Sequence, residues 1–247
     1  MKTIIIAILL LGKPLIACSQ TVTYDGGGYG HFMMGPSWLQ SYTLTDYIME
    51  APVLGMDAEA NRMSMMVGGE GFAIVGRFIV GGGGMAMEGV TWRSYKGNAT
   101  VSSGAGYFKT GYCIITNTRQ FLVTGLAIGG SNTGIELSNT SNDASIAFDP
   151  RSPVESGDTG GYSLNSLFLE PFAAWKLFTI AGNDASGVGG MLVGIDAGCS
   201  MLLASGNWQD REMDIAADIP TPAIICYPFI RITIGGGGVG YHVNTSN

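Results

Sequence analysis

Residues 191–203 read MLVGIDAGCSMLL, with an apolar side chain or a cysteine at every odd-numbered position. Asp196 and Ser200 fall on the opposite parity. Successive side chains of a β-strand point to opposite faces, so this alternation predicts a strand with one continuous apolar face. The outer face of a soluble β-sandwich would carry many more Lys, Glu and Thr residues than the single charge found here.

Two other segments repeat the pattern. Residues 167–177 set Glu170 and Lys176 on the parity opposite to a run of apolar residues, and residues 230–234 alternate isoleucine with Arg231 and Thr233. We expect the apolar faces to contact lipid and the isolated charges to meet one another inside a narrow barrel. The predicted lipid-facing residues are Leu167, Leu169, Trp175, Leu177, Val193, Ile195, Ile230, Ile232 and Ile234. The predicted lumen charges are Glu170, Lys176, Asp196 and Arg231.

Eight strand-like runs, rich in aromatic residues, β-branched residues, Met and Gly, are separated by turn residues. They are residues 29–39, 63–75, 78–88, 100–116, 120–137, 162–180, 187–204 and 223–241. Their connections alternate between long and short, apart from an intermediate third connection at 89–99. The second is the two-residue turn Gly76-Arg77, and the fourth is residues 117–119. An even strand count with short turns at one end and long loops at the other predicts a closed antiparallel up-and-down β-barrel.

The composition restricts the class of protein. The chain has 247 residues, of which 46% are hydrophobic and 13% charged, with a net charge of -7 and 39 glycines. Such a chain is not disordered, and it lacks the basic stripe of a nucleic-acid binder. No window after Leu11 reaches 18 apolar residues, so the sequence predicts no membrane-spanning helix. One all-β domain can use the whole length.

The N-terminus predicts export. Lys2 precedes an apolar run at 4–11 that is too short to span a membrane, and we expect residues 1–19 to be a signal peptide and residues 20–247 a single barrel domain. Cleavage after Ser19 competes with a lipobox-like interpretation of residues 15–18, in which Cys18 would be lipidated. A non-cleaved anchor is the third alternative. Loss of Lys2 and Lys13 would bring the net charge to -9.

The cysteines give no recognisable motif. Cys113, Cys199 and Cys226 remain after export, an odd number without a CxxC spacing. We therefore expect neither a disulfide framework nor a metal knuckle, but small apolar residues in the barrel.

Glycine clusters occupy residues 68–71, 81–84 and 235–238. Strand-like residues continue on both sides of each cluster, which excludes the strand-loop-helix order of a dinucleotide-binding loop. The turn at Gly76 predicts a register that pairs Val75 with Phe78 and Gly71 with Gly82. Glycine in strand interiors permits bending and close packing beneath large aromatic side chains.

The chain resembles the small eight-stranded outer-membrane β-barrels of Gram-negative bacteria, with an OmpA-like or OmpX-like architecture. The resemblance rests on the export signal, the loop alternation, and strands such as 167–179 and 227–234. The resemblance covers residues 25–242 and implies a location in the outer membrane. Such barrels commonly end on an aromatic residue, whereas here six residues follow Tyr241.

Candidate chemistry is sparse. We expect His31 on the first strand and His242 on the last, and pairing of these strands could bring the two side chains together at one rim. Two imidazoles without a third ligand make a weak metal site. His31 with Ser37 is the only candidate for a catalytic pair, without a recognisable motif around either residue. We therefore predict no catalytic residue, no cofactor and no metal site.

The long connections carry most of the acidic residues, and solvated loops are the simplest interpretation of them. Carboxylates there could also bind divalent cations or bridge through them to lipopolysaccharide phosphates. The first connection, residues 42–60, has helical spacing and could fold over the barrel mouth.

The main hypothesis is an outer-membrane barrel with a lumen filled by its own side chains and a structural or surface-interaction role in its acidic loops. Its expected partners are outer-membrane lipid or lipopolysaccharide and another envelope protein, and not nucleic acid. One alternative is a periplasmic, extracellular or lipid-anchored soluble barrel that holds a small apolar ligand. The other is an outer-membrane lipid-modifying enzyme. The direction of the continuous apolar face separates the membrane barrel from the soluble one.

Overall fold

The computed structural model describes residues 22–38, 48, 59–60, 63–141, 146, 154–183, 186–210, 216–217 and 226–243. The expected signal peptide and Cys18 lie outside these residues. Within the described part of the chain, no helix is long and apolar enough to cross a membrane.

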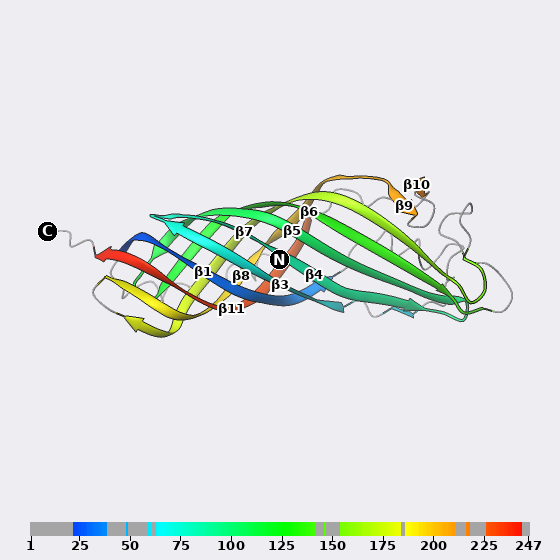
Figure 1. The fold of residues 1–247 in the computed structure, drawn as a ribbon, viewed down its shortest axis with the longest axis horizontal. Helices are drawn as coiled ribbons and strands as arrows, with labels where there is room; N and C mark the ends of the chain where they lie inside the picture. Colours follow the sequence, from blue (N-terminus) through cyan, green and yellow to red (C-terminus); the bar gives the residue numbers. More distant parts are fainter. Residues whose placement is uncertain are drawn as a thin grey trace, which may run out of the picture.

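Eight long strands form the barrel (Figure 1). They are β1 (Val22–Trp38), β3 (Met63–Val75), β4 (Phe78–Arg93), β5 (Gly97–Thr116), β6 (Gln120–Asn139), β7 (Thr159–Asn183), β8 (Gly187–Ser205) and β11 (Cys226–Val243). Three short strands are added at the edges of this ring, namely β2 (Glu59–Ala60), β9 (Trp208–Asp210) and β10 (Ala216–Ala217).

The ring is closed and antiparallel throughout. Each long strand pairs with the next along the chain, and β1 pairs with β11 to complete the circle. Val75 pairs with Phe78 and Gly71 with Gly82, as the turn chemistry predicted. Gly76 adopts a φ of 60°, a left-handed conformation that glycine reaches without the steric cost of a side chain. The predicted up-and-down barrel is therefore confirmed.

Two predicted boundaries were wrong. β1 starts at Val22, seven residues before the expected Tyr29, because residues 22–28 pair with the end of β11. The connection between β4 and β5 is only residues 94–96, because Arg93 still pairs with Asn98. The loop-bearing end therefore has one tight turn beside its long connections.

The two ends of the barrel are named here by their connections. The turn side carries both ends of the described chain, Val22 and Val243, together with Gly76-Arg77 and residues 117–119. The loop side carries the connections that follow β1, β6 and β8. β4 to β7 extend beyond the other strands on the loop side (Figure 1).

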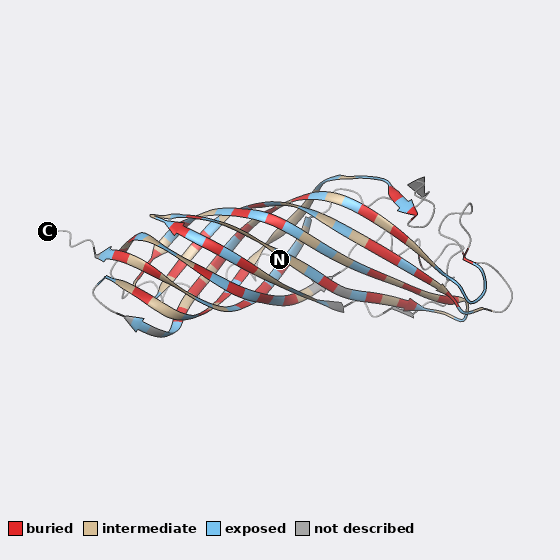
Figure 2. Cartoon of the chain, in the orientation of Figure 1, coloured by how far each residue is buried: buried red, intermediate tan, exposed pale blue. Residues whose placement is uncertain are grey.

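Burial alternates along much of the barrel wall, although residues 197–202 of β8 are uniformly half-buried (Figure 2). On the outer face, Phe32 is 77% exposed and Ile230 and Ile232 are each 55% exposed. The apolar outer face of β8 runs from 191 to 203, roughly 30 Å at a rise of about 3.3 Å per residue and a tilt near 40°. That length matches the apolar band of a membrane barrel, which is about 25 Å tall.

The polarity of β5 and β6 reverses on the loop side. Within the apolar band Lys109 points inward and Phe108 outward, but further along β5 Val101 is buried inside and Ser102 is exposed outside. The inward residues here form an apolar core of their own, which we call the loop-side core. It comprises Ile48, Val90, Trp92, Ala99, Val101, Ile135, Leu137, Ile146, Val154, Tyr162, Leu164 and Trp208.

Ile48 bears on the expectation for the first connection. It is helical, fully buried, and part of the loop-side core. One residue of the connection thus packs against the inner face of the extended strands. Most of the predicted segment 42–60 lies outside the described residues.

Interior aromatic side chains lie over glycines of neighbouring strands. A Cβ on Gly81 would lie 2.6 Å from the ring of Phe72, and one on Gly129 would lie 2.9 Å from the ring of Phe168. A Cβ on Gly237 would lie 2.5 Å from the Cα of Tyr29. A barrel of eight strands has an interior only wide enough for side chains to fill, so large rings need bare backbone opposite them.

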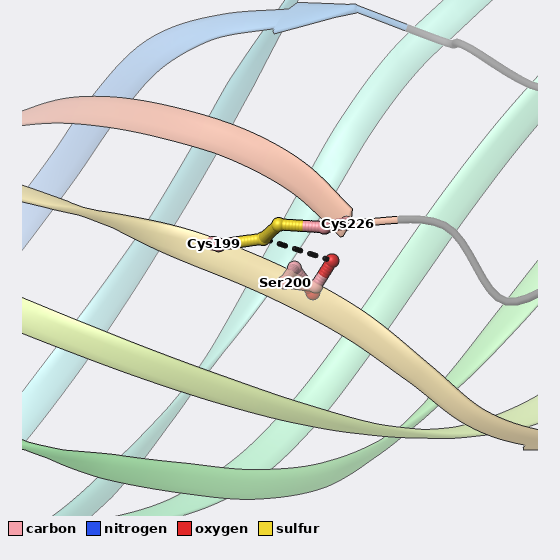
Figure 3. Close-up of a disulfide and its surroundings, with 3 residues drawn as sticks. All are labelled: Cys199, Ser200 and Cys226. Carbon is pink, nitrogen blue, oxygen red and sulfur yellow. Dashed lines mark hydrogen bonds between the residues drawn. A yellow bond between two sulfur atoms is a disulfide. The ribbon is translucent and has the colours of Figure 1, made fainter.

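The expectation of no disulfide was wrong. Cys199 in β8 and Cys226 in β11 form one, with their Cα atoms 5.7 Å apart (Figure 3). Their 27-residue separation concealed the pair, because closure of the barrel makes β8 and β11 neighbours. Cys113 is buried inside the barrel as a free thiol. The disulfide joins the two strands near the point where the last long connection leaves and returns.

Candidate functional site: the polar network inside the barrel

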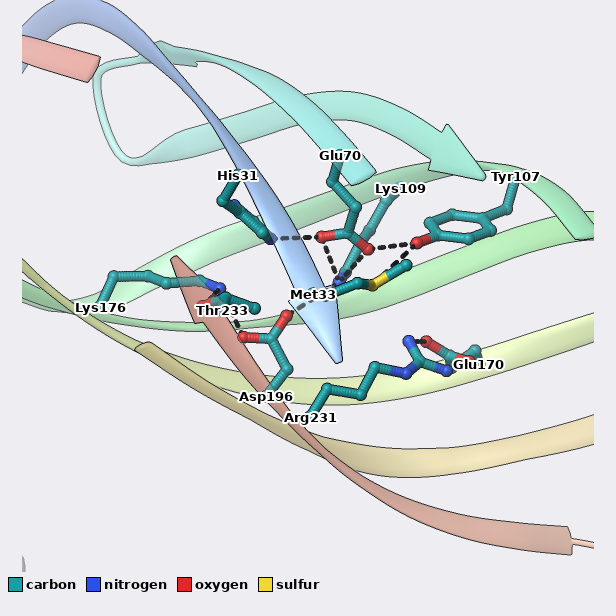
Figure 4. A network of polar contacts seen from close by, with 10 residues as sticks. All are labelled: His31, Met33, Glu70, Tyr107, Lys109, Glu170, Lys176, Asp196, Arg231 and Thr233. Atoms are coloured by element: carbon teal, nitrogen blue, oxygen red, sulfur yellow. Dashed lines mark hydrogen bonds and ion pairs between the residues drawn. The ribbon is translucent and has the colours of Figure 1, made fainter. Parts of the chain in front are cut away.

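A polar network crosses the middle of the barrel (Figure 4). It draws side chains from six long strands, and every one of them points inward. Its ionisable members are His31 (β1), Glu70 (β3), Tyr107 and Lys109 (β5), Glu170 and Lys176 (β7), Asp196 (β8) and Arg231 (β11). All are buried, so the network is shielded from the surroundings of the barrel.

Arg231 and Glu170 form a two-pronged pair. Nη1 of Arg231 lies 2.7 Å from Oε1 of Glu170, and Nη2 lies 2.8 Å from Oε2. Parallel N–H···O bonds of this kind are the strongest side-chain ion pairs, because the planar guanidinium matches the carboxylate. The guanidinium also lies over the ring of Phe229, 3.7 Å from its centroid.

Two lysines hold the other carboxylates. Nζ of Lys109 lies 3.0 Å from Oε1 of Glu70 and 3.3 Å from Oδ2 of Asp196. Nζ of Lys176 lies 2.5 Å from Oδ1 of Asp196 and donates a hydrogen bond to Oγ1 of Thr233 at 2.9 Å. Lys109 therefore bridges the carboxylates of two strands that are not neighbours, β3 and β8, which β1 and β11 separate in the ring.

Glu70 also contacts two aromatic side chains. Nε2 of His31 lies 3.0 Å from Oε2 of Glu70, and the hydroxyl of Tyr107 donates to Oε1 at 2.5 Å. The imidazole of His31 stacks against the rings of Tyr29 and Phe72, with centroid separations of 5.7 and 5.8 Å. These ring contacts fix the imidazole beside the carboxylate.

The network is balanced in charge. Three carboxylates, of Glu70, Glu170 and Asp196, face the three cations of Lys109, Lys176 and Arg231. Burial of an unpaired charge would be costly, and here each carboxylate oxygen pair has a cationic partner. The arrangement suits a fixed plug across the lumen.

A metal ion fits poorly in this arrangement. His31, Glu70 and Asp196 could each offer one ligand atom, and these atoms lie within 4.8 Å of one another. However, the ammonium of Lys109 already lies between Glu70 and Asp196. A divalent cation would have to displace that ammonium and would add two charges to a neutral buried cluster.

The four predicted lumen charges, Glu170, Lys176, Asp196 and Arg231, all lie in this network and pair as Glu170–Arg231 and Asp196–Lys176. The nine predicted lipid-facing residues all lie on the outer face, exposed or half-buried. Sequence reasoning missed His31, Glu70, Tyr107 and Lys109 as members. Glu70 lies inside a glycine cluster, so the alternation of its own strand does not show whether its side chain points inward or outward. The predicted pairing of Gly71 with Gly82 does place Glu70 opposite Gly83.

The first and last strands pair as predicted, but the expectation that His31 and His242 approach each other at one rim was wrong. His31 pairs with Gly235 in the middle of β1, whereas His242 pairs with Thr23 at the turn side, where it is exposed and lies 3.1 Å from Asp25. The early start of β1 places His31 far from the rim. Ser37 is six residues further along the same strand, about 20 Å away, so His31 and Ser37 form no catalytic pair.

No family model matches the chain, and no curated protein matches it. Its structure is similar to known barrels. The outer membrane protein OprG from Pseudomonas aeruginosa aligns with a TM-score of 0.38 and 9% identity, covering 90% of this chain and 98% of OprG. The outer membrane protease OmpT from Escherichia coli aligns with a TM-score of 0.30 and 8% identity, covering 89% and 96%. At these scores we infer nothing about function from either protein.

Proposed function

We propose that the protein is an outer-membrane β-barrel. One observation carries this proposal: the interior holds ionised side chains while the outer face holds large apolar ones such as Phe32, Ile195 and Ile232. A soluble barrel that binds an apolar ligand requires the opposite arrangement, with its apolar face inside. A closed strand ring also satisfies most of its backbone hydrogen bonds internally, as lipid demands.

Cell fractionation tests this proposal directly. We expect the full-length protein in the outer-membrane fraction, released only by detergent, and migrating faster on an SDS gel before boiling than after. Recovery in the soluble fraction without a heat-dependent shift would contradict the proposal and restore the soluble, ligand-binding alternative.

We further propose that the barrel does not conduct solutes as a general porin. The support is the charge-balanced network at mid-height, together with the aromatic packing on its turn side around Phe121, Phe172 and Phe178. Planar bilayers containing the purified protein should show no stable porin-like conductance steps. Steps in the range of a water-filled pore would contradict a filled lumen.

The loop side is our proposed interaction surface. β4 to β7 stand beyond the apolar band with a core of their own, which gives the long connections a rigid base. The sequence between β6 and β7 is acidic, with Asp143, Asp149, Glu155 and Asp158. Carboxylates suit divalent cations that bridge to lipopolysaccharide phosphates, and they also suit a basic surface of another envelope protein.

Binding of purified lipopolysaccharide tests the first of these partners. We expect calcium-dependent binding that is lost on addition of EDTA and weakened at least fivefold when the four acidic residues are changed to Asn or Gln. Asp25→Asn on the turn side is the matched control. Binding that is unaffected by both EDTA and the substitutions would contradict a cation bridge and favour a protein partner.

A further inference from the structure

The hydrogen-bonded ladder that closes the barrel stops before its strands do. β1 and β11 pair from Val22↔Val243 to Met34↔Ile232, and no further. On its other edge β1 continues to pair with β3 up to Trp38, and β11 pairs with β8 from Cys226. Residues 35–38 and 228–231, which we call the seam segment, therefore face each other without ladder pairs.

The two strands are still neighbours where the ladder stops. A Cβ on Gly35 would lie 3.2 Å from the Cα of Arg231 and would collide with the carbonyl oxygen of Ile230. Physical separation of the strands is thus not the reason that the pairing ends at this point.

The register identifies which positions should carry the bonds. Antiparallel residues alternate between closely spaced pairs without hydrogen bonds and wider pairs that exchange two. Inward-facing pairs of this seam are the close ones, since a Cβ on Gly27 would lie 2.8 Å from the Cα of Val239. The outward-facing positions must therefore supply the hydrogen bonds between β1 and β11.

Prolines occupy both of the next outward positions. Continuing the register beyond Met34↔Ile232 sets Pro36 opposite Ile230 and Pro228 opposite Trp38. Proline has no N–H to donate. The outward positions bond across this seam, so Pro36 and Pro228 both lack an N–H on the edge that faces it. On their other edges the two prolines remain paired, as Pro36↔Met65 and Pro228↔Cys199.

A third proline provides a comparison within the same barrel. Pro171 pairs with Leu126 of β6, but the β7–β8 ladder has no pair between Leu169↔Met201 and Phe172↔Gly198. A single proline interrupts a ladder that then resumes. Two prolines at successive bonding positions end it.

The disulfide decides which edge of β11 stays attached. Cys226 lies two residues before the seam segment of β11, and it is bonded to Cys199 of β8. Covalent and ladder contacts thus both hold this end of β11 to β8. Any separation on the loop side must occur at its other edge, towards β1.

We propose that the seam segment is a lateral gate in the barrel wall. β1 and β11 part there towards the surrounding membrane while the remaining ladders stay closed. Opening exposes Phe229 and Arg231, which lie on the inner side of β11, to the lipid phase. This proposal rests on membrane insertion, which vesicle flotation checks separately on the same sample.

Hydrogen exchange of the barrel in detergent micelles, read by NMR, tests the gate. We expect the amides of Trp38 and Ile230 to exchange at least tenfold faster than those of Phe32 and Ile234, which occupy equivalent positions in the paired part. In the double variant Pro36→Val with Pro228→Val, the exchange at Trp38 and Ile230 should slow at least tenfold. Pro171→Val should leave both amides unchanged.

Two results would overturn the gate. One is equal protection of all four amides in the wild-type barrel. The other is unchanged exchange in a double variant that still shows the heat-dependent gel shift. If the double variant does not fold, Pro36→Val alone restores one N–H donor to the seam. Slower amide exchange at Ile230 in this variant then supports the gate, and unchanged exchange overturns it.

Discussion

The guanidinium of Arg231 and the carboxylate of Glu170 meet through two bonds of 2.7 and 2.8 Å, although their strands are not neighbours. β8 lies between β7 and β11, so the pair reaches across the interior of the barrel. Such a bridge ties together parts of the ring that no backbone ladder joins directly.

Removal of one partner should therefore be costly. Glu170→Ala leaves a buried guanidinium without its carboxylate, and we expect a loss of about 3–5 kcal/mol in the free energy of unfolding. Urea unfolding in lipid vesicles measures it. Glu136→Ala, at an exposed position, is the control. A loss below about 1 kcal/mol for Glu170→Ala would contradict the assigned pairing, and Glu170→Ala with Arg231→Met should recover most of the stability.

The ammonium of Lys109 should prevent a metal ion from binding between Glu70 and Asp196. In Lys109→Met, the carboxylates of Glu70 and Asp196 lose their shared ammonium while His31 remains beside them. We expect the variant to gain a zinc-dependent rise in thermal stability that the wild-type protein lacks. His31→Ala added to Lys109→Met should abolish it. Zinc stabilisation of the wild type to the same degree would show that Lys109 does not compete.

The inward glycines should tolerate no side chain. Gly81→Ala would drive a Cβ against the ring and backbone of Phe72, and we expect a loss of about 3 kcal/mol or failure to fold. Gly71→Ala has no atom within 4 Å of its new Cβ and should be neutral or slightly stabilising. Refolding yield on a semi-native gel compares the two. Equal yields would contradict the packing described for the interior.

The stability cost of a charged residue on the outer face should depend on its height along the barrel. Ile232→Lys in the apolar band should cost about 2–4 kcal/mol, whereas Ser102→Lys on the extended part of β5 should cost less than about 1 kcal/mol. The comparison uses unfolding in vesicles of one lipid composition. Equal effects at the two positions would show that the apolar band is not the membrane boundary.

The disulfide can be counted chemically. Alkylation of the denatured chain from residue 20 onward should add one group without reductant, at Cys113, and three after reduction. Cys199→Ser should lower stability by about 3 kcal/mol, with Cys113→Ser as the control. Uptake of three groups without reductant would contradict the bond.

Alternation was enough to predict the fold where one parity is purely apolar. β7, β8 and β11 show such parity, and the four lumen charges on them were found from it. β3 and β4 were different, because glycine at both parities leaves no contrast to read, and Glu70 was overlooked for that reason. Its place became predictable only through the hairpin register around Gly76.

Long-range closure was the other limit. The pairing of β8 with β11 crosses a long connection, so nothing local to Cys199 or Cys226 indicates the bond between them. Likewise, residues 22–26 extend β1 because the end of β11 lies beside them. Features of this kind depend on which strands meet, and this information is spread over the whole chain.

The reversal of polarity along β5 and β6 has a consequence for how this molecule could diversify. Each strand joins a segment suited to hydrocarbon to one suited to water, and the change occurs between Phe108 and Ser102 on β5. The segment on the loop side is filled by its own loop-side core, so changes in the loops that it carries need not alter the apolar outer face of the rest of the barrel. Two independently evolvable parts thus share one continuous set of strands.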